Sequence, residues 1–283
     1  MIRSLTSAVS GIQQFQEEID VIGNNIANVN TVAFKAARTD LADSFSQTLA
    51  SSNLGGDESA QVGLGVITAG ITNEYTQGAI NRTGVETDLA VSGDGFFLVK
   101  DPVSGETFVT RAGDFRLDSS NYLVTGNGLR VQGYNDLGLS TIGDIQIDAA
   151  QRPASADPAA TMVSFSIDDL GQIDVRLSDG SEYVRGQVLM QNFTNPQGLV
   201  KEGNNLYSGI AAAGPLGGAT SPTPAAAGTN GLGRIQSGAL ELSNVDLSNE
   251  FANLILAQRA FQANARIITT SDEMLQELVN LKR

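Results

Sequence analysis

The sequence contains no histidine, no cysteine and no tryptophan, and these absences exclude whole classes of chemistry. Without histidine, no unperturbed side chain changes charge near neutral pH, and imidazole-based triads and metal centres are excluded. Without cysteine there is no disulfide, no thiolate metal site and no thiol nucleophile. An enzyme would have to rely on carboxylates, lysine, tyrosine or serine. The composition therefore favours a non-catalytic protein and predicts neither a cofactor nor a metal.

Long hydrophobic runs and basic residues are also scarce. No stretch approaches the ~18–20 continuous apolar residues of a membrane-spanning helix, so we expect no membrane insertion. Gln13, Gln14, Glu17, Glu18 and Asp20 interrupt the region where a secretory signal has its apolar segment, so the chain is expected either to stay in the cytoplasm or to be exported without a cleaved signal peptide. With 17 basic residues against 31 acidic ones, the net charge is −14, and nucleic acid is not an expected partner.

Two kinds of pattern fill the 283 residues. Apolar residues recur at helical spacing near both ends, whereas the middle carries short alternating runs broken by glycine and aspartate, typical of antiparallel strands. The predicted fold class is α+β, with long N- and C-terminal helices pairing as a coiled-coil-like stalk and a mainly antiparallel, all-β central domain. The predicted order is an axial helix at 1–30, a connecting segment at 31–75, a β domain at 76–207, a low-complexity linker and connecting segment at 208–243, and an axial helix at 244–283.

Both predicted helices carry an apolar stripe spaced by threes and fours. An isolated amphipathic helix is marginal in water, and one partner helix covers only part of such a stripe. Two interpretations stay open: the helices pack within one chain, or they reach full burial only against neighbouring copies. In the second case the polymer interface comprises Ile2, Leu5, Val9, Ile12, Phe15, Ile19, Ile22, Ile26, Val29, Leu247, Phe251, Leu254, Phe261, Ala265, Ile268 and Leu275.

Local signals in the middle of the chain predict particular strands and loops. Residues 96–99, 107–111, 122–124 and 183–191 are expected to be strands, and Met162–Ile167 is expected to form a hairpin with Gln172–Leu177. Asp168, Asp169 and Asp174 lack the spacing of an EF-hand and are interpreted as turn and strand carboxylates. Two stretches poor in charge and rich in small residues, 44–60 and 209–231, are expected to be mobile or loosely attached.

Six stretches in order along the chain resemble the signatures of the bacterial flagellar rod and hook protein family: Asp20–Lys35, Val62–Val66, Thr87–Phe97, Thr110–Phe115, Gly238–Leu247 and Ala257–Asn264. The resemblance implies terminal helices that pair and line the inner tube of a hollow helical polymer, with the β domain outside. The signature polar residues are Asn24, Asn25, Asn28, Asn30, Asn244, Gln258 and Asn264. From the residues alone, the first four form either a helix stop or an amide network that fixes helix register.

The resemblance also implies partners and a role. It predicts self-association, contact with adjacent rod and hook-junction proteins, and export by the flagellar type III apparatus beneath an assembly cap. The C-terminal motif is most similar to that of hook subunits, which implies a bendable joint that transmits torque, whereas the chain length is nearer that of distal rod subunits. A hook subunit is therefore expected, with a rod (drive-shaft) subunit as the alternative.

Two other classes of protein would need features of their own. A carboxylate-based hydrolase would need two acidic residues converging in a cleft, and an adhesin on a helical stalk would need an exposed aromatic patch.

Ala33 stands where relatives commonly carry glycine. If the backbone there has a positive φ, alanine is strained.

Overall fold

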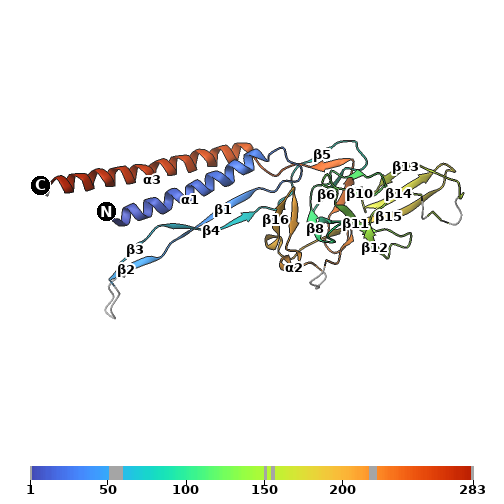
Figure 1. The fold of residues 1–283 in the computed structure, drawn as a ribbon, viewed down its shortest axis with the longest axis horizontal. Coiled ribbons are helices and arrows are strands. Elements are labelled where there is room, and N and C mark those ends of the chain that lie inside the picture. The colour runs from blue at the N-terminus through green and yellow to red at the C-terminus, as the bar shows by residue number, and fades with distance from the viewer. Residues whose placement is uncertain (1, 51–59, 150–151, 154–156, 217–221, 282–283) are drawn as a thin grey trace. The chain divides into compact units, whose positions relative to one another are not determined.

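The computed structural model describes residues 2–50, 60–149, 152–153, 157–216 and 222–281 (Figure 1). Contacts divide the chain into two compact units. Unit 1 consists of residues 1–29, 35–74 and 245–283, and unit 2 consists of residues 30–34 and 75–244. The chain therefore passes between the two units four times, after residues 29, 34, 74 and 244.

Unit 1 contains the two long helices, α1 (Ile2–Ala27) and α3 (Leu247–Leu281), which lie side by side (Figure 1). It also contains β1 (Ala37–Asp43), β2 (Ser46–Ala50), β3 (Ala60–Gly63) and β4 (Val66–Asn73). β1 pairs with β4 and β2 with β3, both antiparallel, and β1 and β4 pack against α1. Asp246 caps α3, because its carboxylate accepts the backbone N–H of Ser248 at 2.9 Å.

Unit 2 is built on antiparallel strands. The main sheet runs in the order β13-β14-β15-β11-β7-β8-β17-β16. Its elements are β5 (Ile80–Arg82), β6 (Leu89–Ser92), β7 (Phe96–Lys100), β8 (Thr107–Thr110), β9 (Arg116–Leu117), β10 (Leu123–Val124), β11 (Arg130–Tyr134), β12 (Ile142–Asp144), β13 (Met162–Ile167), β14 (Gln172–Leu177), β15 (Glu182–Gln191), η1 (Pro196–Gly198), β16 (Val200–Gly203), β17 (Leu206–Ser208), α2 (Ile210–Ala213), β18 (Ala225–Ala226), β19 (Arg234–Ser237) and β20 (Ala239–Glu241). The predicted α+β class, with terminal helices and an antiparallel β centre, is confirmed.

The strands bury two hydrophobic clusters within unit 2. The larger one gathers side chains such as Phe97, Phe115 and Ile173, and the smaller one centres on Phe96, Phe193 and Tyr207. The predicted hairpin of β13 and β14 is confirmed, with Phe165 opposite Val175. It was readable from sequence because its strands alternate and its turn is local.

The segment 208–243 is more ordered than expected. Its residues contribute α2, β18, β19 and β20, and β18 pairs with β15. Ala213 and Ala227 are each 1% exposed. The expectation of loose attachment is wrong for these residues, because small side chains allow the backbone to lie close to the sheet. Residues 217–221, like 51–59 of the other stretch, lie outside the described residues, while β2 and β3 pair on either side of 51–59.

Ala33 has a left-handed backbone conformation, with φ of 55°, and is fully buried in unit 2. A side chain with a Cβ costs ~1–2 kcal/mol in this region relative to the right-handed one. The strain expected from the glycine-to-alanine departure is therefore present.

Candidate assembly interface

The inner side of α3 is marked by small or polar residues at seven-residue spacing. Glu250, Ala257, Asn264 and Ser271 share this side, and Ala257 and Ser271 are each 2% exposed. On α1, Gly11 is buried where it meets Asn264, since a Cβ added at Gly11 would lie 2.8 Å from the Asn264 Nδ2 atom. We call this contact line the inner seam. It allows the two helices to approach closely within one chain.

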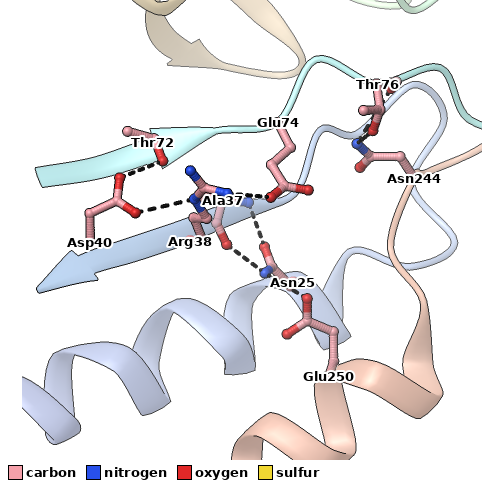
Figure 2. A network of polar contacts seen from close by, with 9 residues as sticks. All are labelled: Asn25, Ala37, Arg38, Asp40, Thr72, Glu74, Thr76, Asn244 and Glu250. Carbon is pink, nitrogen blue, oxygen red and sulfur yellow. Dashed lines mark hydrogen bonds and ion pairs between the residues drawn. The ribbon is translucent and has the colours of Figure 1, made fainter.

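Asn25 ties three elements of unit 1 together (Figure 2). Its side chain is 1% exposed, and its amide pairs with both backbone groups of Ala37 on β1. Nδ2 donates to the Ala37 carbonyl at 2.8 Å, Oδ1 accepts the Ala37 N–H at 3.0 Å, and Nδ2 also donates to Glu250 Oε1 on α3 at 3.2 Å. Asn25 therefore bonds α1 to both β1 and α3.

Other signature amide residues form hydrogen bonds or are exposed. Asn28 donates to the Asn24 carbonyl and side-chain oxygens at 2.9 and 3.0 Å, so this pair closes the end of α1. In unit 2, Asn244 donates to Thr76 Oγ1 at 2.8 Å. Asn30 and Gln258 are exposed.

Strand β4 approaches α1 so closely that a glycine is needed. Ser10 Oγ on α1 accepts the N–H of Val66 at 3.3 Å, and Thr68 Oγ1 donates to Glu17 Oε2 at 2.6 Å. Gly65, with φ of +135°, precedes this contact, and a Cβ there would lie 2.1 Å from Ser10 Oγ. A side chain at position 65 is therefore disfavoured both by the backbone and by space.

The residues predicted as a polymer interface have unequal exposure. Ile22 is 5% exposed and is buried inside unit 1. Val9, Leu247, Phe251 and Leu275 are exposed, and the side chain of Ile2 falls outside the described residues. The partly buried members are Leu5, Ile12, Phe15, Ile19, Ile26, Val29, Leu254, Phe261, Ala265 and Ile268.

A second apolar stripe on α3 was missed by the sequence reasoning. Leu256, Ile267, Met274, Leu278 and Leu281 are 68%, 42%, 49%, 49% and 81% exposed. Helix geometry places Leu256 roughly a quarter turn around α3 from the inner seam and the other members closer to it, and Leu278, seven residues after Ser271, continues the line of the seam itself. We call them the outer stripe, and the groove lined by Thr270, Glu273, Met274, Glu277, Leu278 and Leu281 lies along it. The signal was readable, because Ala260, Ala263 and Thr270 complete the spacing by threes and fours.

The electrostatics of unit 1 concern two carboxyl groups. Partial burial raises the pKa of Glu18 and of Glu250 above the ordinary glutamate value. The hydrogen bond from Asn25 opposes this rise in the pKa of Glu250, and the negative charges of Glu74 and Asp246 add to it.

Among the described residues, no group of three or more potential ligands is placed to hold a metal ion, and no helix is both long and apolar enough to cross a membrane.

Comparisons with known protein families match three parts of the chain. Residues 5–35 match the model for "Flagella basal body rod protein". Residues 90–175 match "Flagellar hook protein FlgE/F/G D1 domain", and residues 236–281 match "Flagellar basal body rod FlgEFG protein C-terminal". The outer matches cover most of both long helices, and the central one lies in unit 2.

Comparisons with individual proteins extend over the whole chain. The flagellar basal-body rod protein FlgG of Bacillus subtilis is 44% identical over 288 residues and covers 100% of both chains. FlgG of Agrobacterium fabrum is 34% identical over 281 residues, covering 96% of this chain and 97% of its own. The flagellar hook protein FlgE of Salmonella typhimurium is 27% identical over 423 residues, covering 99% and 100%.

Among solved structures, flagellar hook protein FlgE2 of Helicobacter pylori matches with a TM-score of 0.42 and 10% identity, covering 57% of this chain and 100% of the other. No conclusion rests on this match.

Proposed function

The chain belongs to the family of flagellar basal-body rod and hook proteins, and we propose that within it the chain is a subunit of the distal rod, the drive shaft of the basal body. Membership makes it a structural subunit of the flagellar axis, located in the hook or basal body. The rod assignment rests on full-length similarity. The Bacillus subtilis rod protein aligns over 288 positions, whereas two hook proteins align over 423 and 449 positions against 283 residues here.

The hook reading therefore has less support than the rod alternative. The alignments with hook proteins run well beyond the length of this chain, so those proteins contain segments that have no counterpart here. The similarity to rod proteins needs no such extra segment. A rigid shaft rather than a bendable joint is accordingly the proposed mechanical role.

We propose that copies polymerise through unit 1. The outer stripe of α3 supports this, because apolar side chains exposed at helical spacing gain burial against another copy. Burying an exposed leucine or methionine completely contributes roughly 1.5–3 kcal/mol. The predicted stripe residues that stay exposed, Val9, Leu247, Phe251 and Leu275, are proposed to take part as well.

The remaining partners follow from the family. We propose contacts with adjacent rod and hook-junction proteins, export by the flagellar type III apparatus without a cleaved signal peptide, and growth beneath an assembly cap. No catalytic role is proposed, since the function of such a subunit is the polymer itself.

Electron microscopy of basal bodies from a host strain lacking this chain tests the rod assignment. A truncated rod is the expected result. Complete rods that lack only the hook would overturn the rod assignment and favour the hook.

A charge placed on the outer stripe tests the proposed interface. Leu278→Asp is expected to abolish polymer formation, because a carboxylate cannot be buried unpaired in an apolar contact. Val103→Asp is the matched control, since Val103 is 92% exposed in unit 2. Sedimentation and complementation of motility measure assembly. Normal polymers from the Leu278 variant would remove the outer stripe from the interface.

A further inference from the structure

Three segments of unit 2 adjoin the points where the chain enters or leaves it, and the third is bonded to each of the other two; we call these segments connections. The first is residues 30–34, the second begins at Tyr75, and the third ends at Asn244. β5 in the second connection pairs with β20 in the third, with Ile80 opposite Glu241. The N–H of Asn244 donates to the Phe34 carbonyl at 3.4 Å, which joins the third connection to the first.

Glu241 is the residue where these connections meet. Its backbone carbonyl accepts the N–H of Ala33 at 2.8 Å. Its Oε1 accepts the N–H of Gly78 at 2.9 Å, and its Oε2 forms an ion pair with Arg111 Nη1 at 3.3 Å. One fully buried residue therefore holds the first connection, the second connection and a side chain from the sheet.

Arg111 connects Glu241 to the main sheet of unit 2. It follows β8, is 3% exposed, and donates from Nη2 to the Gly93 carbonyl at 2.9 Å. Its guanidinium lies 5.2 Å from the ring centre of Phe96 on β7, and the Tyr75 ring packs against the same ring at 5.8 Å. Tyr75, at the start of the second connection, and the Arg111 guanidinium thus both pack against the Phe96 ring.

The position of this pair matters more than any gain in stability. A buried ion pair is weak support for stability, because desolvation offsets the attraction. In the described residues Arg111 Nε is also buried without a hydrogen-bond partner. What the pair does have is a geometry in which both carboxylate oxygens and both guanidinium Nη atoms contact different segments.

We propose that Arg111 and Glu241 form a mechanical clasp that holds the three connections of unit 2 in one bundle fixed to its sheet. Force entering through one connection is then shared by the others. The proposal rests on the proposed function only for the source of that force, namely the torque that a rod or hook subunit transmits. The clasp itself is a property of the single chain.

Amide hydrogen exchange of the purified full-length chain tests the clasp. In the Arg111→Met/Glu241→Leu double variant the pair is replaced by apolar groups, which keeps unit 2 folded where a single change would leave a buried charge unpaired. The amides of Ala33 and Gly78 are expected to exchange at least about tenfold faster than in the unmodified chain, because their region opens locally. The β7 amides are expected to change less than about twofold.

Two control variants separate the clasp from ion pairs in general. Asp148→Asn breaks another largely buried pair, Arg185–Asp148, and Glu182→Gln breaks the exposed pair Arg176–Glu182. Neither is expected to change exchange at Ala33 or Gly78. If the double variant leaves those amides protected, or accelerates all of unit 2 equally, the clasp is overturned. The micrographs of the deletion strain decide the rod assignment independently of this outcome.

Discussion

Unit 2 contains both hydrophobic clusters found in the described residues, whereas unit 1 contains 17 of the 26 large apolar side chains that are exposed there. Unit 1 is held together by the inner seam, the Asn25 hydrogen bonds and the close approach of β4 to α1. Unit 2 has a conventional core. The difference shows that one chain combines a part with a conventional core and a part that leaves more large apolar side chains exposed, which is the surface that the proposed polymer would bury.

Truncating one large apolar side chain in each unit, buried in unit 2 and exposed in unit 1, gives the largest expected contrast. Phe97→Ala, at a fully buried site in unit 2, is expected to cost ~3–5 kcal/mol of unfolding free energy. Leu278→Ala, on the exposed outer stripe, is expected to change the stability of the monomer by less than ~0.5 kcal/mol.

The two units can be observed separately in that experiment. All five tyrosines belong to unit 2, so tyrosine fluorescence in denaturant follows that unit, while helical circular dichroism follows chiefly α1 and α3. A large loss in the Leu278 variant would mean that the outer stripe already supports the monomer.

Adding a methyl group at Gly65 is expected to destabilise unit 1 by ~1–3 kcal/mol. The new Cβ meets Ser10, and the backbone at position 65 is unsuited to alanine. Gly63→Ala is the matched control, because nothing lies within 4 Å of its added Cβ. Thermal unfolding followed by helical circular dichroism compares the two, and equal midpoints would refute the close approach of β4 to α1.

Removing the Asn25 amide is expected to cost ~1–3 kcal/mol, because the backbone groups of Ala37 lose their partners. Gln16→Ala, at an exposed site on the same helix, should stay within ~0.5 kcal/mol. Hydrogen exchange at the Ala37 amide is the direct measurement. Unchanged protection there would show that Asn25 does not hold β1.

Replacing Ala33 by glycine is expected to stabilise unit 2 by up to ~1 kcal/mol, since relief of the left-handed strain exceeds the added freedom of the unfolded chain. Ala90→Gly, in strand β6 of the same unit, should instead lose ~0.5–1 kcal/mol. Denaturant midpoints from tyrosine fluorescence measure both changes. A loss of stability in the Ala33 variant would contradict the strain.

The smallest effect concerns pH. Since the folded-state pKa of Glu250 is raised, the folded state binds its proton more readily than the unfolded state. Its contribution to the stability of unit 1 is therefore present at low pH and is lost as pH rises through the raised pKa. Glu250→Gln should flatten this part of the stability profile above about pH 4. Identical profiles for the two proteins would exclude the effect.

Sequence patterns predicted the helices and the hairpin, which depend on residues close together in the chain. Helical spacing gave α1 and α3, and alternation around a local turn gave β13 and β14. Strand pairings between segments far apart in the sequence were not predicted. An example is β1, whose Ala37 lies opposite Asn73 of β4. Nothing local marks Asn25 among four similar asparagines, because its partners lie on β1 and α3. Low complexity was also misleading, since Ala213 and Ala227 are buried through their small size.

The difference in exposure between the inner seam and the outer stripe of α3 has a consequence for growth. The inner seam is satisfied within each chain, whereas the outer stripe is not. When an exposed patch binds a different patch on the next copy, each addition fills one site and presents another, so the assembly does not close on itself. In the proposed polymer, the free energy gained by the last subunit then equals that gained by the tenth. The final number of subunits is therefore set by something other than this chain's own contacts.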